Sequence, residues 1–157
     1  MNQFRVWQKE HKRFLYPVEN SPHVIDSKTG EKAYLHTPAG TAPISIGLTL
    51  NGLVYYRCDQ VMGKMEDVVL QQYIGLKDRD GKEIYEGDIL YSFHGEAVHT
   101  EVIYNKGDEE TDNFGILDDR WCYKYPNGNI NFLNAYRAKR LKIVGNIFEN
   151  RELLCEK

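Results

Sequence analysis

An Asn-Gly pair at positions 51 and 52 is the feature that most restricts how this sequence can fold. Apolar residues alternate with small polar ones from Ile44 to Leu50 before the pair, and a β-type run follows at positions 53–56. A type I′ turn needs positive φ at both central residues, and Asn-Gly tolerates this better than most pairs. Residues 44–57 therefore predict an antiparallel β-hairpin.

Short β-type runs bounded by turn formers recur along most of the chain. Aromatic-rich runs at 4–7 and 13–16 predict a first hairpin, and Asp78 to Gly81 and Asn127-Gly128 predict tight turns. Further strands are predicted at residues 70–76, 83–91, 98–104, 114–117, 121–125 and 141–148. In the 83–91 segment, Ile89 and Tyr91 would share one face.

Two segments depart from this pattern. Residues 18–43 are rich in Pro and Gly and keep no period, so we expect an extended loop with at most brief structure. Residues 131–140 place apolar residues at helical spacing and cations towards the C-terminal end, which predicts a short helix. Asn150 is an expected N-cap for a final turn at 151–154.

Composition bounds the class of protein. The chain has 157 residues, enough for one domain that buries roughly 70% of its unfolded surface, so neither a disulfide nor a metal is needed for stability. Its formal charge of −3 argues against a protein that coats duplex DNA. Three cysteines without a C-x-x-C pair favour a reducing cytoplasm, and no apolar run is long enough for a membrane span or a signal peptide.

Three segments together resemble the YopX family of phage and prophage proteins. They are residues 4–7, the long run 72–89, and residues 144–150 followed by Leu153-Leu154. The resemblance spans nearly the whole chain, although 18–43 and 106–113 depart from it. It implies a small phage or prophage protein without established activity and without assigned catalytic or binding residues. It also implies a β-rich α+β domain whose second half contains a small barrel.

We therefore predict an α+β fold that is predominantly antiparallel β. One YopX-like domain would cover residues 1–157, with N-terminal hairpins and the long loop in 1–69 and a barrel-like half with a short C-terminal helix in 70–157. The run from Tyr85 to Leu90 also resembles the start of SH3-like barrels, where x-Gly-Asp-x-Val opens the first strand.

No motif predicts catalysis, a cofactor or a metal. Asp78-x-Asp80-Gly81 is not an EF-hand, because Leu76 and Gly87 would occupy ligand positions that require carboxylates. Two histidines, His94 and His99, have opposite parity on a continuous strand, so only an intervening turn could make them a metal pair. Acidic residues that could serve acid/base chemistry are Glu83, Glu86 and Asp88, but sequence spacing cannot place them around a pocket.

The candidate binding residues combine aromatic rings with cations: Trp121, Tyr123, Tyr125, Arg137, Lys139, Arg140 and Lys142. Alternation puts the three aromatics on one face of a strand, which suits core packing and also suits stacking with single-stranded nucleic acid. An acidic cluster at 108–112 and 118–119 is either a solvated hairpin tip or a surface that mimics nucleic acid or docks on a basic host protein.

Three functions remain open at this point. The first is a non-enzymatic phage accessory protein, cytoplasmic in the bacterial host, that binds a host or phage protein. A homo-oligomer is a further form that this function can take. A nucleic-acid-binding module that uses the aromatic and basic residues is the alternative. An enzyme of unknown type is the third, and it would need a pocket with convergent polar groups.

Overall fold

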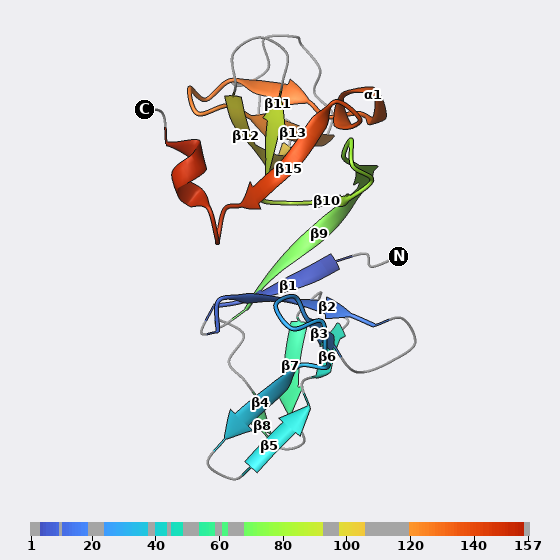
Figure 1. Ribbon diagram of the computed structural model, residues 1–157, viewed down its shortest axis with the longest axis vertical. Coiled ribbons are helices and arrows are strands. Elements are labelled where there is room, and N and C mark those ends of the chain that lie inside the picture. The colour runs from blue at the N-terminus through green and yellow to red at the C-terminus, as the bar shows by residue number, and fades with distance from the viewer. Residues whose placement is uncertain are drawn as a thin grey trace. The chain divides into compact units, whose positions relative to one another are not determined.

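A computed structural model describes residues 4–9, 11–18, 24–37, 40–43, 45–48, 54–58, 61–62, 68–92, 98–105 and 120–155. Contacts divide the chain into two compact units, Met1–Gln72 and Tyr73–Lys157. Antiparallel β-strands make up most of the described structure, which confirms the predicted fold class (Figure 1). Helix is limited to α1 (Ala135–Ala138) and the 3-10 turn η2 (Arg151–Leu154) in the described residues.

The predicted first hairpin is confirmed. Its strands are β1 (Phe4–Gln8) and β2 (Arg13–Pro17), with Val6 opposite Leu15. On its other side β1 pairs with the first half of β9 (Val68–Lys77), and β2 pairs with β3 (Val24–Asp26). The first unit is therefore built on the strand order β9-β1-β2-β3.

One apolar cluster of the first unit lies on one face of these strands. Its buried members are Val6, Leu15, Val24 and Ala33, each 2% exposed or less. Burying a side chain of the size of Val or Leu contributes about 1.5–3 kcal/mol relative to leaving it exposed. Trp7 and Phe14, which pair across the hairpin on its other face, are also buried, so both faces of these two strands are covered.

A polar cluster is also buried in the first unit. The Arg13 guanidinium forms a salt bridge with Asp26 and donates from Nε to Gln8 Oε1 at 2.7 Å. Asp26 Oδ1 accepts the Lys28 amide at 2.7 Å, which shapes the turn after β3. Burial alone would raise the pKa of Asp26, but the Lys28 amide and the Arg13 cation outweigh burial and hold that pKa below its ordinary value.

The expected loop at 18–43 is wrong in part, because it contains three short strands. Besides β3, they are β4 (Tyr34–Thr37) and β5 (Gly40–Pro43), which pair with each other. Strands of three or four residues are too short to show a period in the sequence. Pro43 lies on β5, an edge strand of a two-stranded sheet, where the missing N–H is tolerated.

The hairpin predicted at 44–57 is confirmed, with a different register. β6 (Ser45–Leu48) pairs with β7 (Val54–Cys58), and β7 continues to β8 (Val61–Met62). A two-residue turn at 51–52 would place Leu48 opposite Tyr55, whereas Leu48 lies opposite Val54. The predicted turn residues themselves lie outside the described residues.

The second unit contains a five-stranded antiparallel sheet in the order β14-β13-β12-β11-β15 (Figure 1). Its strands are β11 (Asp88–Ser92), β12 (Val98–Asn105), β13 (Arg120–Lys124), β14 (Ile130–Phe132) and β15 (Leu141–Asn146). Four strands form a meander, and after α1 the fifth returns to pair with the first. This is the strand order expected of an SH3-like barrel, and Gly87-Asp88 opens its first strand as predicted. The single strand predicted at 83–91 is wrong, because a turn at Glu86-Gly87 separates residues 83–85 from β11.

The core of the second unit packs against one face of this sheet and gathers residues from distant segments. Its buried members are Ile74, Ile84, Leu90, Val102, Tyr123, Leu133, Ala138 and Leu141. Ile74 and Ile84 come from the second half of β9 and from β10 (Glu83–Tyr85), which pair with each other. The helix α1 contributes Ala138, which is fully buried and anchors it to the core.

Two buried carboxylates explain the long run shared with the YopX resemblance. Asp78 accepts the amides of Asp80 and Lys82 through Oδ1, each at 2.9 Å, and the amide of Ile143 through Oδ2 at 3.0 Å. Arg79 donates its amide to the Leu141 carbonyl at 3.0 Å, so the turn lies along the outer edge of β15. Gly81 has a φ of +81°, which glycine adopts without strain.

The second carboxylate, Asp88, is 1% exposed. Its Oδ2 accepts the Tyr85 amide at 2.9 Å, and its Oδ1 accepts the Asn146 side-chain amide at 3.2 Å. Gly87 precedes it with a φ of +73°. Both Asp78 and Asp88 therefore hold turns and strand ends together, which agrees with a folding role for this run.

Four further expectations differ from the structure or lie outside it. The helix predicted at 131–140 is wrong over its first part, because Phe132 ends strand β14 and α1 spans only four residues. The last strand ends at Asn146, and the predicted strand 114–117 lies outside the described residues. Asn150 does precede η2, but its side chain makes no capping hydrogen bond. None of the described helices has the length and apolarity of a membrane span.

Candidate functional site

The three predicted aromatic residues face the core. Trp121 and Tyr123 lie on β13, and Tyr125 comes directly after it. Tyr123 is a core member and is 9% exposed, while Trp121 and Tyr125 are partly buried and pack against the same core. Burial is the largest cause that raises the pKa of Tyr123, and the neighbouring Tyr125 raises it further. The ring of Tyr123 is therefore not available as a stacking platform, which corrects the nucleic-acid interpretation of that residue.

The four predicted cations do not converge on those rings. Lys142 points to Asp80, with Nζ 3.2 Å from its Oδ2, and Lys139 is an exposed residue at the end of α1. Arg137 lies between the two groups: its Nη1 donates to the Phe132 carbonyl at 2.6 Å, and its guanidinium carbon is 6.0 Å from the Tyr123 ring centre. The predicted set is thus divided between different parts of the unit.

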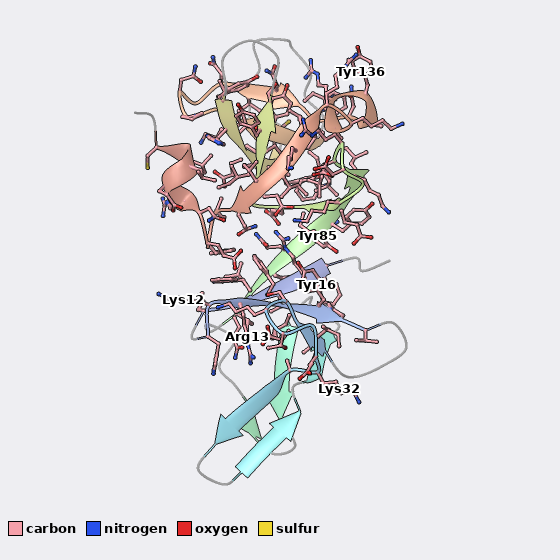
Figure 2. The ribbon with its side chains drawn as sticks, in the orientation of Figure 1. Lys12, Arg13, Tyr16, Lys32, Tyr85 and Tyr136 are labelled. Carbon is pink, nitrogen blue, oxygen red and sulfur yellow. The ribbon has the colours of Figure 1, made fainter. Side chains whose placement is uncertain are left out.

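The structure instead brings arginines onto two other rings. The Arg120 guanidinium lies over the Phe132 ring with a centroid distance of 5.0 Å, and Arg140 lies over Tyr136 at 3.7 Å. Phe132 is 42% exposed and Tyr136 is 65% exposed, and Tyr136 projects away from α1 in Figure 2. We define the aromatic–arginine surface by its five residues, Arg120, Phe132, Tyr136, Arg137 and Arg140.

Local sequence explains how this surface forms. The turn at Asn127-Gly128, with Gly128 at a φ of +89°, reverses the chain from β13 into β14. Asn134 then caps α1, because its Oδ1 accepts the Arg137 amide at 2.9 Å. Leu133, just before α1, and Ala138, at its end, are both buried, so Tyr136 is left on the solvent side of the helix.

The aromatic–arginine surface lies in a segment whose charged side chains are all positive. Residues 120–148 contain six Lys or Arg side chains and no Asp or Glu, although acidic side chains outnumber basic ones, 23 to 20, in the whole chain. A guanidinium can stack on a ring and donate hydrogen bonds from its edge at the same time. The aromatic–arginine surface can therefore present apolar area together with donors for a carboxylate or a phosphate.

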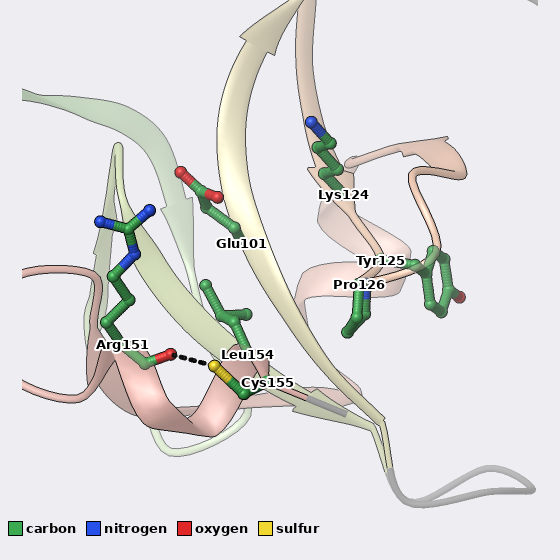
Figure 3. A pocket seen from close by; sticks show the side chains of 7 residues that line it. All are labelled: Glu101, Lys124, Tyr125, Pro126, Arg151, Leu154 and Cys155. Carbon is green, nitrogen blue, oxygen red and sulfur yellow. Dashed lines mark hydrogen bonds between the residues drawn. The ribbon is translucent and has the colours of Figure 1, made fainter. Parts of the chain in front are cut away.

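A pocket of about 280 Å³ lies elsewhere in the second unit (Figure 3). It is lined by Glu101, Lys124, Tyr125, Pro126, Arg151, Leu154 and Cys155. Glu101 and Lys124 face each other across β12 and β13, and the Cys155 thiol lies 4.0 Å from the Arg151 carbonyl oxygen. Its charged groups are mixed, and the pocket holds no buried pair of carboxylates of the kind that acid/base catalysis uses.

Comparison with protein families bears out the resemblance described from the sequence. The family model described as YopX protein matches residues 3–155. The chain belongs to the YopX family. Protein EF1440 from Enterococcus faecalis, whose crystal structure is known, is 24% identical to this YopX protein, with 99% of each chain covered and a TM-score of 0.49. No curated protein matches the chain.

The remaining candidates in this YopX protein are placed as follows. His99 lies on β12 with its ring 5.3 Å from that of Tyr91, and His94 lies outside the described residues. In the part of the chain that the structure describes, no group of three or more His, Cys, Asp or Glu side chains is arranged to hold a metal. Glu83 accepts a hydrogen bond from the Tyr85 hydroxyl at 2.8 Å, and Asp88 is enclosed by its own turn.

Sequence reasoning missed Phe132 and Tyr136 as surface residues of this YopX protein, because their spacing fits the apolar face of a helix. A signal was present. Asn127-Gly128 followed by Ile130-Asn131-Phe132 is a hairpin pattern, and Asn134 is a favoured N-cap that starts a new element. Taking these two signals together moves Phe132 to a strand and Tyr136 to a separate turn of helix.

Proposed function

We propose that this YopX protein is a non-enzymatic protein-interaction module whose contact surface is the aromatic–arginine surface. The observation that carries the proposal is the pair of exposed rings, Phe132 and Tyr136, each covered on one face by a guanidinium. Tyr and Arg are enriched among the residues that dominate the binding energy of protein interfaces. The charge of residues 120–148 favours an acidic partner.

A nucleic-acid partner is the second candidate, because aromatics beside cations also suit single strands. Two features make it weaker. Tyr123, the central ring of the predicted stacking surface, is buried. Arg120 and Arg140 each cover one face of Phe132 and Tyr136, so a base could stack only on the other face of each ring. A protein partner can use the ring edges and the guanidinium donors together.

The setting of the proposal rests on the family. We propose that the protein is a phage or prophage accessory protein that acts in the cytoplasm of the bacterial host, with a host or phage protein as partner. Self-association through the same surface is an alternative form of the same activity. An enzymatic role has no observation in its favour comparable to the two exposed rings.

Affinity capture from the natural bacterial host, with and without nuclease, tests the proposal. The natural protein is compared with the double variant Phe132→Ala/Tyr136→Ala, and Val144→Ala serves as a matched control because Val144 is exposed on β15. We expect the natural protein and the control to capture one discrete acidic protein, with or without nuclease. The double variant should capture about tenfold less of it, or even less than that. Circular dichroism should show all three proteins folded.

Two outcomes would overturn this proposal. A protein partner retained by the double variant would mean that binding uses another surface. Partners that disappear on nuclease treatment, with nucleic acid in the untreated eluate, would put the nucleic-acid function first. Salt dependence separates the two partner classes further, since nucleic-acid binding falls steeply with salt.

A further inference from the structure

Strand β14 is the edge of its sheet, and its hydrogen-bonding pattern can be read from its neighbours. The Leu133 amide donates to the Trp121 carbonyl at 3.1 Å, and the Tyr125 amide donates to the Asn129 carbonyl at 2.8 Å. In an antiparallel pair such bonds alternate along the strand. The backbone groups of Asn129, Asn131 and Leu133 therefore point to β13, and those of Ile130 and Phe132 point away from the sheet.

The outward groups are only partly satisfied. The Phe132 carbonyl accepts the Arg137 guanidinium at 2.6 Å. Within the described ranges, no hydrogen bond reaches the amide or carbonyl of Ile130 or the amide of Phe132. Three adjacent backbone groups thus form an open edge, which natural sheets usually cover, twist away or charge.

We infer that this edge takes an extended, acidic segment of the partner protein as an added antiparallel strand. This inference rests on the proposed function and names its binding mode. In strand addition, backbone hydrogen bonds give affinity, and pockets for alternate side chains give specificity. Ile130 would exchange both of its backbone bonds with one partner residue, and the Phe132 amide would supply the next bond.

The side chains around the edge define the chemistry of the segment. Phe132 offers a ring that is 42% exposed, so an apolar partner residue opposite it gains a contact. Arg120 lies over that ring, and Arg137 ends the strand at the Phe132 carbonyl. Carboxylates at alternate positions of the added strand would meet these guanidinium groups, whereas cations there would be repelled.

Synthetic peptides test this directly on the full-length protein by amide-resolved NMR. The probe is a blocked decapeptide of alternating Val and Glu, compared with one of Val and Lys and with a Val-Glu peptide whose two central Val residues are Pro. We expect the first peptide to slow the exchange of the Ile130 and Phe132 amides by about tenfold or more at saturation. The Lys and Pro peptides should leave both rates unchanged.

A backbone variant supplies an independent measurement. Ile130→Pro removes the outward amide that no described residue uses, and an edge position tolerates proline. Ile130→Val keeps the amide and serves as the control. We expect Ile130→Pro to weaken the Val-Glu peptide by about tenfold while Ile130→Val leaves its affinity unchanged. If Ile130→Pro does not fold, the exchange measurement on the natural protein decides alone.

Failure of the inference and failure of the proposed function give different results. Equal binding of the Pro peptide and the Val-Glu peptide, or no slowing of Ile130 and Phe132 exchange by the Val-Glu peptide, would overturn strand addition. If Phe132→Ala/Tyr136→Ala still abolishes capture of the host protein, the proposed function stands and only its mode is wrong. If Phe132→Ala/Tyr136→Ala captures the host protein as well as the natural protein does, the proposed function itself is wrong.

Discussion

The Asp78 carboxylate accepts a hydrogen bond from the amide of Ile143, which lies 65 positions later in the chain, at 3.0 Å. The same carboxylate also accepts the amides of Asp80 and Lys82. One buried side chain therefore shapes a local turn and joins it to the last strand of the sheet. Asp80, two residues later, is half exposed and pairs with Lys142.

Replacing Asp78 should be far more damaging than replacing Asp80. Asp78→Ala leaves three amides without their acceptor, so we expect it to lower the free energy of unfolding by about 2–4 kcal/mol. Asp80→Ala removes an exposed ion pair and should cost about 0.5 kcal/mol or less. Urea unfolding of the two variants checks this, and equal losses would contradict the assigned role of Asp78.

Gly145 should not accept a side chain while Asn150 is present. An added Cβ would lie 2.6 Å from the Asn150 Oδ1 and 2.8 Å from its Cβ. We expect Gly145→Ala to cost about 1–3 kcal/mol by overpacking. Because Asn150→Gly removes the clashing atoms, Gly145→Ala should cost much less in that background, and a double-mutant cycle by urea unfolding measures the difference. Equal costs in both backgrounds would rule out the clash.

Stability should fall in acid through Asp26. Its pKa lies below the ordinary value of 3.8, so the stability it contributes is present above that value and is lost as pH falls through the folded pKa. Arg13→Gln removes the cation that helps to lower the pKa, and should reduce the loss of stability between neutral and acidic pH. Lys28→Gln is the control, because Lys28 contributes its backbone amide. Urea unfolding at a series of pH values measures this. An equal loss of unfolding free energy with falling pH in Arg13→Gln and in the natural protein would contradict the prediction.

Two tyrosines should ionise late. Burial raises the pKa of both Tyr73 and Tyr123 above the ordinary value of 10.0, with the Glu83 charge adding to the effect at Tyr73. Tyrosinate absorbance should show a late component that shrinks in Tyr73→Phe and in Tyr123→Phe. The stability linked to both groups is complete below the unfolded pKa and is lost as pH rises through the folded one.

Much of the second unit could be predicted from local signals. Asp-Gly at 80–81, the strand at 70–76 and the Gly87-Asp88 start of β11 each depend on contacts within a few residues, which sequence patterns report well. Strands β3, β4 and β5 could not be found, because three or four residues carry no measurable period. Their existence depends on pairing partners, and β-propensity alone does not define them.

The site was less predictable than the fold, for a physical reason. Alternation at Trp121, Tyr123 and Tyr125 places these residues on one face of β13, but the same alternation fits a face in the core and a face in solvent. Which face is buried depends on Ile74 and Ile84, which lie almost 40 residues or more away in sequence. The stacking of Arg140 on Tyr136 depends in turn on where α1 begins, and only the Asn134 cap fixes that.

The two borders of the five-stranded sheet are unequal, and this limits what the protein can build. Along β15, the Leu141 carbonyl and the Ile143 amide are already engaged by Arg79 and Asp78. Endless growth by stacking sheet on sheet needs an open border at both ends of each copy. Through this sheet, strands would be added only at β14, which gives one partner segment for each chain or a closed pair of copies.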